Sequence, residues 1–452
     1  MVNKMKTMTM TAIASMLIAV APMASAVSLS VTKLNYLDQQ VFTTSAAKRL
    51  TLKNVGTKTE SIWTFKVVSE NYRMITNTCG TSLAVGQSCY ANVVFNPLSV
   101  GALSADVTVR TSLTNTAVSL AGSGISPLAE KVGPKKWHPG HYAQLPNKID
   151  LAAVKRIMPN IPPVIEGVMV PVVWSKIETS KGVYDFSALK AQFDVVKAKG
   201  KRMVVLFQDM WFDDLTPQCV PAYMLDDPIY EGGQQVGLNA EGEPAGCETK
   251  RWVPAVMDRI IAAHQALGKA FDSDPMFEGV TTEESAVVAP NARDYVDQLK
   301  RLGSALPLAY PTSLTNMWIN WRTAPYTAEL IDHLYRSGVG FGGPDTVPTT
   351  LYTNEAYPFF PQYAGRTYSL MAAQPTHLIW KENPIGEGLL TLNDVFHFAV
   401  NDPQGINATH LFWWYFKNDT SPYDFFDTVD VINANGAVIN DTCPENLICN
   451  TQ

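Results

Sequence analysis

Two adjacent carboxylates, Glu283 and Glu284, follow the apolar, β-prone run of residues 276–282. A strand that ends in this way delivers acidic side chains to the mouth of a sheet, where barrel enzymes hold their reactive groups. Burial and a like-charged neighbour would raise the pKa of one carboxyl, so that it could donate a proton. Because successive side chains on a strand point to opposite faces, we expect only one of the two to face such a site. The alternative is a solvated acidic pair.

The chain around this pair alternates between β-prone runs and amphipathic helical stretches from Trp137 onward, as a parallel α/β sheet requires. This pattern predicts a (β/α)8 TIM barrel over residues 137–452. A doubly wound sheet is the alternative, although no Gly-rich phosphate loop follows any strand. The eight candidate strands are residues 138–145, 164–174, 202–209, 276–285, 314–321, 338–345, 367–374 and 408–416.

The carboxyl ends of these strands would form the catalytic face of the barrel. Acidic, amide and aromatic side chains are expected there together, a mixture that suits a hydroxyl-rich, weakly hydrophobic ligand. We expect contacts with such a ligand from His141, Tyr142, Trp174, Asp209, Trp211, Trp321, Gln374, Trp413 and Trp414. The remaining expected rim residues are His138, Glu178, Gln208, Asn320, Asp345 and Tyr415.

Residues 174–207, with a Trp, an acidic residue and a Gly-x-Tyr-Asp-Phe turn in that order, resemble glycoside hydrolases of the large retaining TIM-barrel clan. The resemblance implies hydrolysis by two carboxylates: one protonates the leaving glycosidic oxygen, and the other stays ionised to attack or stabilise the anomeric carbon. In that clan the acid/base Glu ends strand four. This role falls here on Glu284 or Glu283, preceded by Thr282 where the clan has Asn.

The clan places its nucleophilic Glu at or after strand seven. The expected strand seven ends in Gln374, and Glu382 is the nearest later candidate, with Glu387 behind it. Alternatively, residues 377–383 form strand seven, which would restore the clan order. Glu382 could also be a loop carboxylate paired with Lys381.

The first 26 residues have the pattern of a secretory signal: two lysines, an apolar run and Ala24-Ser25-Ala26. We therefore expect a secreted or periplasmic protein without a lipid anchor or membrane span. In an oxidising compartment the six cysteines predict three local disulfides; metal binding is the alternative use. The expected pairs are Cys79 with Cys89, Cys219 with Cys247, and Cys443 with Cys449. The second bond would staple a long polar loop, residues 209–250, that could cover the substrate.

Short β-branched and aromatic runs separated by turn signals predict an antiparallel β-sandwich over residues 27–125. The paired cysteines, the Phe95-Asn96-Pro97 turn and the closing Gly-x-Gly resemble bacterial Ig-like modules of the choice-of-anchor D and ASPM–SPD-2–Hydin type. The resemblance implies attachment to a cell surface or matrix. Residues 126–136 are the expected linker.

A formal net charge of −6 without a long basic run argues against nucleic acid as a partner. No cofactor is expected, and no metal, because His138 and His141 lack a third ligand. The sequence therefore favours a hydrolase acting on a polysaccharide or oligosaccharide. Two alternatives stay open: a carbohydrate-binding or cell-surface protein with a degenerate barrel, and a polysaccharide lyase with His141 or a Tyr as base.

Overall fold

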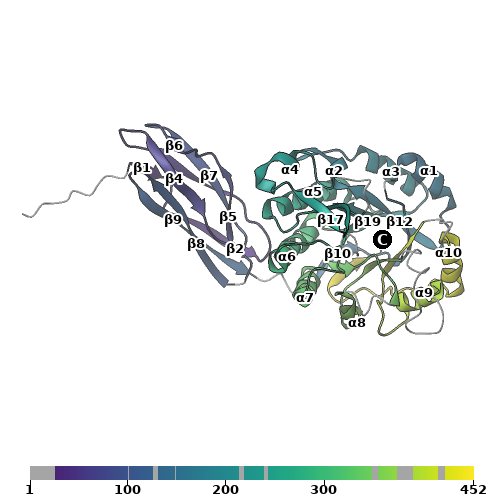
Figure 1. Ribbon diagram of the computed structural model, residues 1–452. Coiled ribbons are helices and arrows are strands. Elements are labelled where there is room, and N and C mark those ends of the chain that lie inside the picture. The colour runs from purple at the N-terminus through teal and green to yellow at the C-terminus, as the bar shows by residue number, and fades with distance from the viewer. Residues whose placement is uncertain are drawn as a thin grey trace, which may run out of the picture. The chain divides into compact units, whose positions relative to one another are not determined.

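The computed structural model divides into two compact units, one holding most of residues 26–122 and the other running from Ser123 to the C-terminus (Figure 1). Two short segments, Asp38–Thr44 and Asn96–Gly101, belong to the second unit. The structure describes residues 26–99, 101–125, 131–147, 149–212, 218–238, 243–348, 355–373, 390–415 and 423–451.

The first unit consists of two sheets that share one hydrophobic core. Their strand orders are β1-β3-β7-β5 and β2-β9-β8-β4-β6, and the pairs β1/β3, β3/β7, β5/β7, β4/β6 and β4/β8 are antiparallel. Leu50 from one sheet and Phe65 from the other are buried in this core, since side chains alternate between the faces of each strand. The Cys79–Cys89 disulfide forms as predicted. The strands are β1 (Val27–Leu29), β2 (Lys33–Gln40), β3 (Lys48–Asn54), β4 (Glu60–Val67), β5 (Tyr72–Asn77), β6 (Ser82–Leu83), β7 (Ser88–Phe95), β8 (Gly101–Thr111) and β9 (Asn115–Ile125).

Eight parallel strands form the central sheet of the second unit, in the order β21-β20-β19-β15-β12-β11-β23-β22. A parallel bridge between Gly343 and Met371 joins the two ends of this order, so that the sheet is nearly closed. This is the strand arrangement of a TIM barrel, as the sequence predicted. The strands are β11 (Gly140–Gln144), β12 (Ile165–Val173), β15 (Arg202–Gln208), β19 (Phe277–Thr282), β20 (Leu314–Trp318), β21 (Gly340–Gly342), β22 (Leu370–Ala373) and β23 (His410–Trp414).

Two hydrophobic layers lie on either side of the barrel wall. Strand β12 shows the division: Val168 and Val170 belong to the layer under the helices, and Met169 belongs to the barrel interior. Helix α5 begins at Pro254, which suits a first helical position because the missing N–H would be unpaired there anyway. The helices are α1 (Leu151–Ile157), α2 (Trp174–Ile177), α3 (Ser187–Ala198), α4 (Tyr223–Asp226), α5 (Pro254–Phe271), α6 (Ala292–Ala309), α7 (Thr327–Ser337), α8 (Phe360–Tyr363), α9 (Leu392–Val400) and α10 (Phe425–Ala434), with 3-10 turns η1 (Met158–Asn160), η2 (Pro228–Tyr230) and η4 (Tyr357–Phe359).

Small sheets elaborate the barrel. Strands β16 (Met210–Trp211), β17 (Gln234–Leu238) and β18 (Pro244–Thr249) form one after the third barrel strand, with β18 in the middle, and the Cys219–Cys247 disulfide crosses this segment. Strands β10 (Val132–Lys136) and β24 (Leu447–Asn450) pair with each other, and Cys443–Cys449 lies beside them. Strands β13 (Glu178–Ser180) and β14 (Val183–Tyr184) form a hairpin. Both disulfides match the predicted pairs. Within the described ranges, no helix is long and apolar enough to cross a membrane.

An ion cluster around Glu278 is buried at the amino-terminal end of the barrel. The Glu278 carboxylate accepts the backbone N–H of His138 at 2.9 Å and lies 2.8 Å from its Nδ1. Arg202 Nη1 lies 3.5 Å and His410 Nε2 3.7 Å from the same carboxylate. Burial raises the pKa of Glu278, but its interactions with His138 and the nearby His410 outweigh burial and lower the pKa to about 2. His138 was expected at the opposite end; β11 begins only at Gly140, so His138 precedes the strand.

The substitution Glu278→Ala should destabilise the barrel strongly, because it leaves Arg202 and two histidines without their shared carboxylate. Removing one partner of a buried ion pair lowers the free energy of unfolding by about 3–5 kcal/mol. Thermal unfolding followed by circular dichroism would show this loss as a lower Tm. The control is Glu166→Ala. Glu166 is 45% exposed and lies 3.4 Å from Nε of the same arginine, and such pairs contribute about 1 kcal/mol or less. Equal Tm shifts in the two variants would contradict this role for Glu278.

Candidate active site

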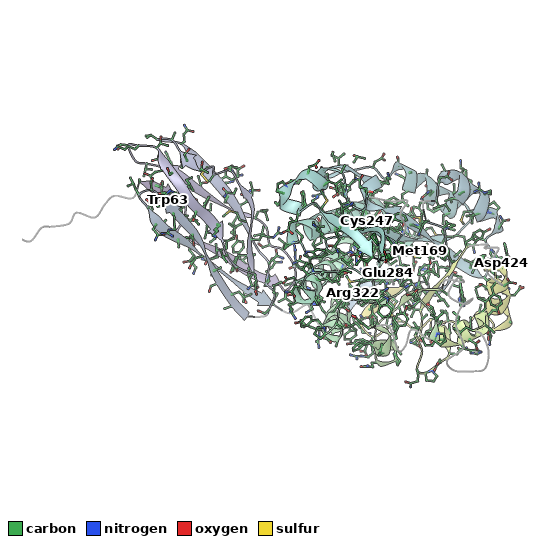
Figure 2. The ribbon with its side chains drawn as sticks, viewed as in Figure 1. Trp63, Met169, Cys247, Glu284, Arg322 and Asp424 are labelled. Carbon is green, nitrogen blue, oxygen red and sulfur yellow. A yellow bond between two sulfur atoms is a disulfide. The ribbon has the colours of Figure 1, made fainter. Side chains whose placement is uncertain are left out.

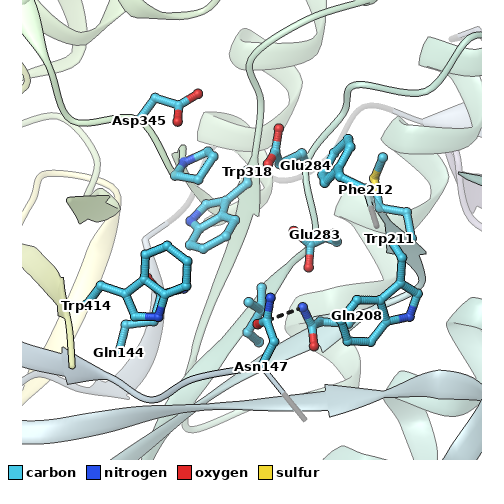
Figure 3. A pocket seen from close by; sticks show the side chains of 13 residues that line it. Gln144, Asn147, Gln208, Trp211, Phe212, Glu283, Glu284, Trp318, Asp345 and Trp414 are labelled. Atoms are coloured by element: carbon cyan, nitrogen blue, oxygen red, sulfur yellow. Dashed lines mark hydrogen bonds between the residues drawn. The ribbon is translucent and has the colours of Figure 1, made fainter. Parts of the chain in front are cut away.

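A pocket of about 300 Å³ opens at the carboxyl ends of the barrel strands (Figure 3). Its walls combine carboxylates, amides and aromatic rings, and in Figure 3 Trp414 and Trp211 flank the central Glu283 from opposite sides. The lining residues are Gln144, Asn147, Leu206, Gln208, Met210, Trp211, Phe212, Glu283, Glu284, Trp318, Pro344, Asp345 and Trp414.

Glu283 and Glu284 both line the pocket. We had expected only one of them to face it, because neighbours on a strand point to opposite sides. That expectation was wrong: β19 ends at Thr282, so both residues follow the strand and its alternation no longer governs them. Figure 2 marks the position of Glu284 in the second unit. The two carboxyl groups therefore share one site.

A buried arginine holds the turn that carries these two residues. Arg251 donates from Nη1 to the Glu284 carbonyl at 2.5 Å and from Nε to Asp209 Oδ2 at 2.8 Å, and its Nη2 donates to Asp209 Oδ1. Both side chains of this ion pair are 3% exposed. The next residue, Ser285, is held by Tyr295, whose hydroxyl donates to its carbonyl at 3.0 Å. A two-pronged arginine–carboxylate pair has a fixed geometry, so the backbone at Glu284 is fixed as well.

The pKa values of both glutamates are raised. For Glu283, burial and the nearby Asp209 carboxylate raise the pKa to about 7. For Glu284, burial and then the charges of Asp345 and Glu283 hold the pKa well above its usual range, although Asn320 Nδ2 donates to its Oε2. Glu284 therefore keeps its proton at pH values where an exposed glutamate has lost it.

A third carboxylate, Asp345, lines the pocket from the residues after β21. Its backbone N–H donates to the hydroxyl of Tyr357 at 3.2 Å, and its charge acts on Glu284. The pocket thus brings together carboxylates that follow the fourth and sixth strands of the barrel. The sequence placed Asp345 on the rim but assigned it no role.

Of the expected ligand contacts, the structure brings Trp211 and Trp414 to the pocket. Trp413 and His141 do not line the pocket. Both are buried and contact each other instead, with the Trp413 indole N–H donating to His141 Nδ1 at 3.1 Å. Burial lowers the pKa of His141 to about 4. Tyr142 fills the barrel interior instead of the rim. In each case strand alternation turns the side chain away from the site or places it too deep.

Three other residues that were expected to contact the ligand do not line the pocket. Trp174 is buried under the helices, where its indole N–H donates to Glu178 Oε2 at 2.9 Å. Asp209 stands behind the pocket, paired with Arg251. Trp321 is partly buried outside the pocket lining, and its carbonyl accepts a hydrogen bond from Ser285 Oγ at 2.8 Å.

Gln374 and Glu382, the expected strand-seven residues, lie outside the described residues. Seven lining residues were missed from the sequence, among them Trp318 and Gln144. The period-two pattern could have found both: Trp318 shares the inward face of β20 with Leu314, and Gln144 lies two positions after Tyr142 on β11. Among the described residues, no group of three or more His, Cys, Asp or Glu side chains is arranged to hold a metal ion.

No protein-family model matches the chain, and no curated protein matches it either. A family 39 glycoside hydrolase from Bacteroides cellulosilyticus WH2 is similar with a TM-score of 0.36 at 11% identity, over 85% of this chain and 74% of that chain. A β-galactosidase from Marinomonas ef1 has a TM-score of 0.41 at 10% identity, over 61% and 53%. The VesB protease of Vibrio cholerae has a TM-score of 0.20 at 12% identity, over 22% and 32%. This chain therefore spans about half of the β-galactosidase and a third of the protease, and its fold is assigned from its own strand order.

Replacing Glu283 by Gln should stabilise the protein at high pH. The raised pKa means that the folded protein favours the protonated form of Glu283. The stability that this protonated form contributes is fully present below pH 4.5 and is lost as the pH rises through about 7. At pH 8 the Glu283→Gln variant should be more stable than the wild type by up to about 3 kcal/mol, and at pH 4 the two should be nearly equal. Tm values at both pH values measure this. The exposed Asp226→Asn is the control, and an advantage for Glu283→Gln that is the same at both pH values would contradict the assignment.

Proposed function

We propose that this protein is a secreted glycoside hydrolase that cleaves glycosidic bonds of a polysaccharide or oligosaccharide. The observation that carries the proposal is the carboxyl of Glu284, which lines the pocket with a raised pKa and feels the charge of Asp345. Glycoside hydrolysis needs one carboxyl that stays neutral and another that stays ionised, and their environments must set the two pKa values apart.

Glu284 takes the role of proton donor. As the bond between the anomeric carbon and the glycosidic oxygen breaks, Glu284 gives its proton to that oxygen. Asp345 is the second carboxylate, which either attacks the anomeric carbon or takes a proton from the water that attacks it. Glu382, the sequence-based choice for this second role, remains the alternative.

The aromatic residues supply the surface on which a sugar ring packs. Trp318 forms part of the pocket and is held by a hydrogen bond from its indole N–H to the Leu370 carbonyl at 3.0 Å. Trp211 and Trp414 add two more indoles. Indole faces pack against the C–H bonds of pyranose rings, while the carboxylates and amides meet the hydroxyls. The buried position of His141 does not favour a lyase with that residue as base.

The proposal includes the cellular setting. The N-terminal sheets act as an Ig-like module that attaches the enzyme to a cell surface or matrix, and the first 26 residues direct secretion. Support comes from the two sheets around one core and from three disulfides, which form in oxidising compartments.

The test is to incubate the purified protein with a panel of polysaccharides and to measure new reducing ends. Glu284→Gln should lower the rate on a cleaved substrate by about 10²–10⁴-fold, the usual contribution of a general acid, without lowering the Tm. Asp345→Asn should cost at least as much, because the second carboxylate takes part in every turnover. Asp226→Asn, an exposed carboxylate of the same unit, should leave the rate unchanged.

Three results would distinguish the hydrolase from a binding protein and assign the second carboxylate. Release of reducing ends that depends on Glu284 supports the hydrolase. Saccharide binding without cleavage would instead support a carbohydrate-binding protein with a degenerate barrel. An active Asp345→Asn variant, together with an inactive Glu382→Gln variant, would transfer the second role to Glu382.

A further inference from the structure

We propose that the sugar ring bound in this pocket carries no negative charge, and that its hydroxyl groups donate hydrogen bonds to Gln144 Oε1, Gln208 Oε1 and Glu283 Oε2. The inference rests on the proposed function in one respect, namely that the ligand is a saccharide. It adds the substrate class: neutral glycans, as opposed to glycans built from uronic acids or bearing sulfate or phosphate.

Three buried acceptor oxygens without a hydrogen-bond donor line this pocket. They belong to Gln144, Gln208 and Glu283, residues that are 4%, 3% and 5% exposed. They come from β11, from β15 and from the residues that follow β19. A buried polar atom without a partner is costly, so these oxygens indicate a ligand that brings its own donors. Sugar hydroxyls are such donors.

The amide of Gln208 has a defined orientation. Its Nε2 donates to Asn147 Oδ1 at 3.2 Å, the contact drawn as a dashed line in Figure 3. The donor end of this side chain is therefore used within the protein, and the acceptor end is the one left for a ligand. Gln208 also lies near the carboxyl of Glu283, which places two of the three acceptors close together.

The described residues that line the pocket disfavour an anionic ligand. Its described lining contains no Lys, Arg or His, but three carboxyl groups, those of Glu283, Glu284 and Asp345. The nearby Arg251 does not compensate, because its guanidinium is already bound to Asp209 and to the Glu284 carbonyl. A carboxylate or sulfate on the sugar ring would thus meet the charge of Asp345, and that of Glu283 once it ionises, in a partly desolvated site. The described lining residues offer it no cation to pair with.

The proposal is tested by calorimetric binding to the full-length Glu284→Gln variant, in which turnover is blocked. The probes are matched oligosaccharide pairs that differ in the oxidation of C6: glucan with glucuronan, mannan with mannuronan, and galactan with galacturonan. At least one neutral member should bind, and its uronate partner should bind at least about 100-fold more weakly, since buried like-charge contacts are strongly unfavourable. Adding Gln208→Ala should weaken neutral binding by about tenfold. Gln362→Ala, an exposed glutamine on α8, should change nothing.

Two results would overturn the inference: a uronate that binds as tightly as its neutral partner, or neutral saccharides that all fail to bind. The wild-type protein separates this inference from the proposed function. Cleavage of a uronan would uphold the hydrolase and overturn the neutral substrate. Binding of a neutral glycan to wild type and variant without cleavage by the wild type would uphold the neutral ligand and overturn the hydrolase.

Discussion

The site depends on one constraint: two adjacent carboxyl groups are forced into a partly dry pocket, and a single buried ion pair holds their backbone. Arg251 ties the carbonyl of Glu284 to the carboxylate of Asp209. The same Asp209 helps to raise the pKa of Glu283, while Arg251 partly offsets that effect. The ion pair thus fixes the backbone at the two glutamates, while their pKa values stay raised. A buried carboxyl with a raised pKa destabilises the folded protein once it ionises. Such a cost is common where a residue is selected for activity and not for stability.

The rest of the barrel is arranged so that this cost is confined to one end. Aromatic and aliphatic residues such as Tyr142, Met169 and Phe412 fill the interior. The amino-terminal end holds Glu278, whose partners lower its pKa instead of raising it. Two buried glutamates on and just after the same strand, Glu278 and Glu284, therefore have opposite electrostatic environments. The first is paired with cationic or protonatable groups, and the second faces other carboxylates.

Strand order, the pairing of the cysteines and the position of the acidic pair follow from the sequence, because each depends on local spacing: apolar runs, short cysteine separations, and a strand that ends in Glu283-Glu284. The directions of several side chains were predicted wrongly from the sequence. His141, Trp174 and Trp413 were expected at the rim, yet they are buried elsewhere because the exact strand limits decide which face a residue occupies. A one-residue error in a strand end reverses that face.

The role of Asp345 and the unpaired oxygens of Gln144 and Gln208 could not be predicted from the sequence. They depend on residues at the carboxyl ends of β11, β15 and β21 lining one pocket, and no local sequence pattern marks that arrangement. The same holds for Arg251, whose 42-residue separation from Asp209 gives no signal in the sequence.

Most of the site's chemistry depends on Glu284 being held protonated in the pocket at the carboxyl ends of the barrel strands. Carbon-13 NMR titration of the labelled glutamate carboxyls, with the Glu284 signal assigned by its loss in the Glu284→Gln variant, measures this directly. The Glu284 signal should titrate well above the range of the exposed glutamates. A Glu284 signal that titrates together with the exposed glutamates would contradict this expectation.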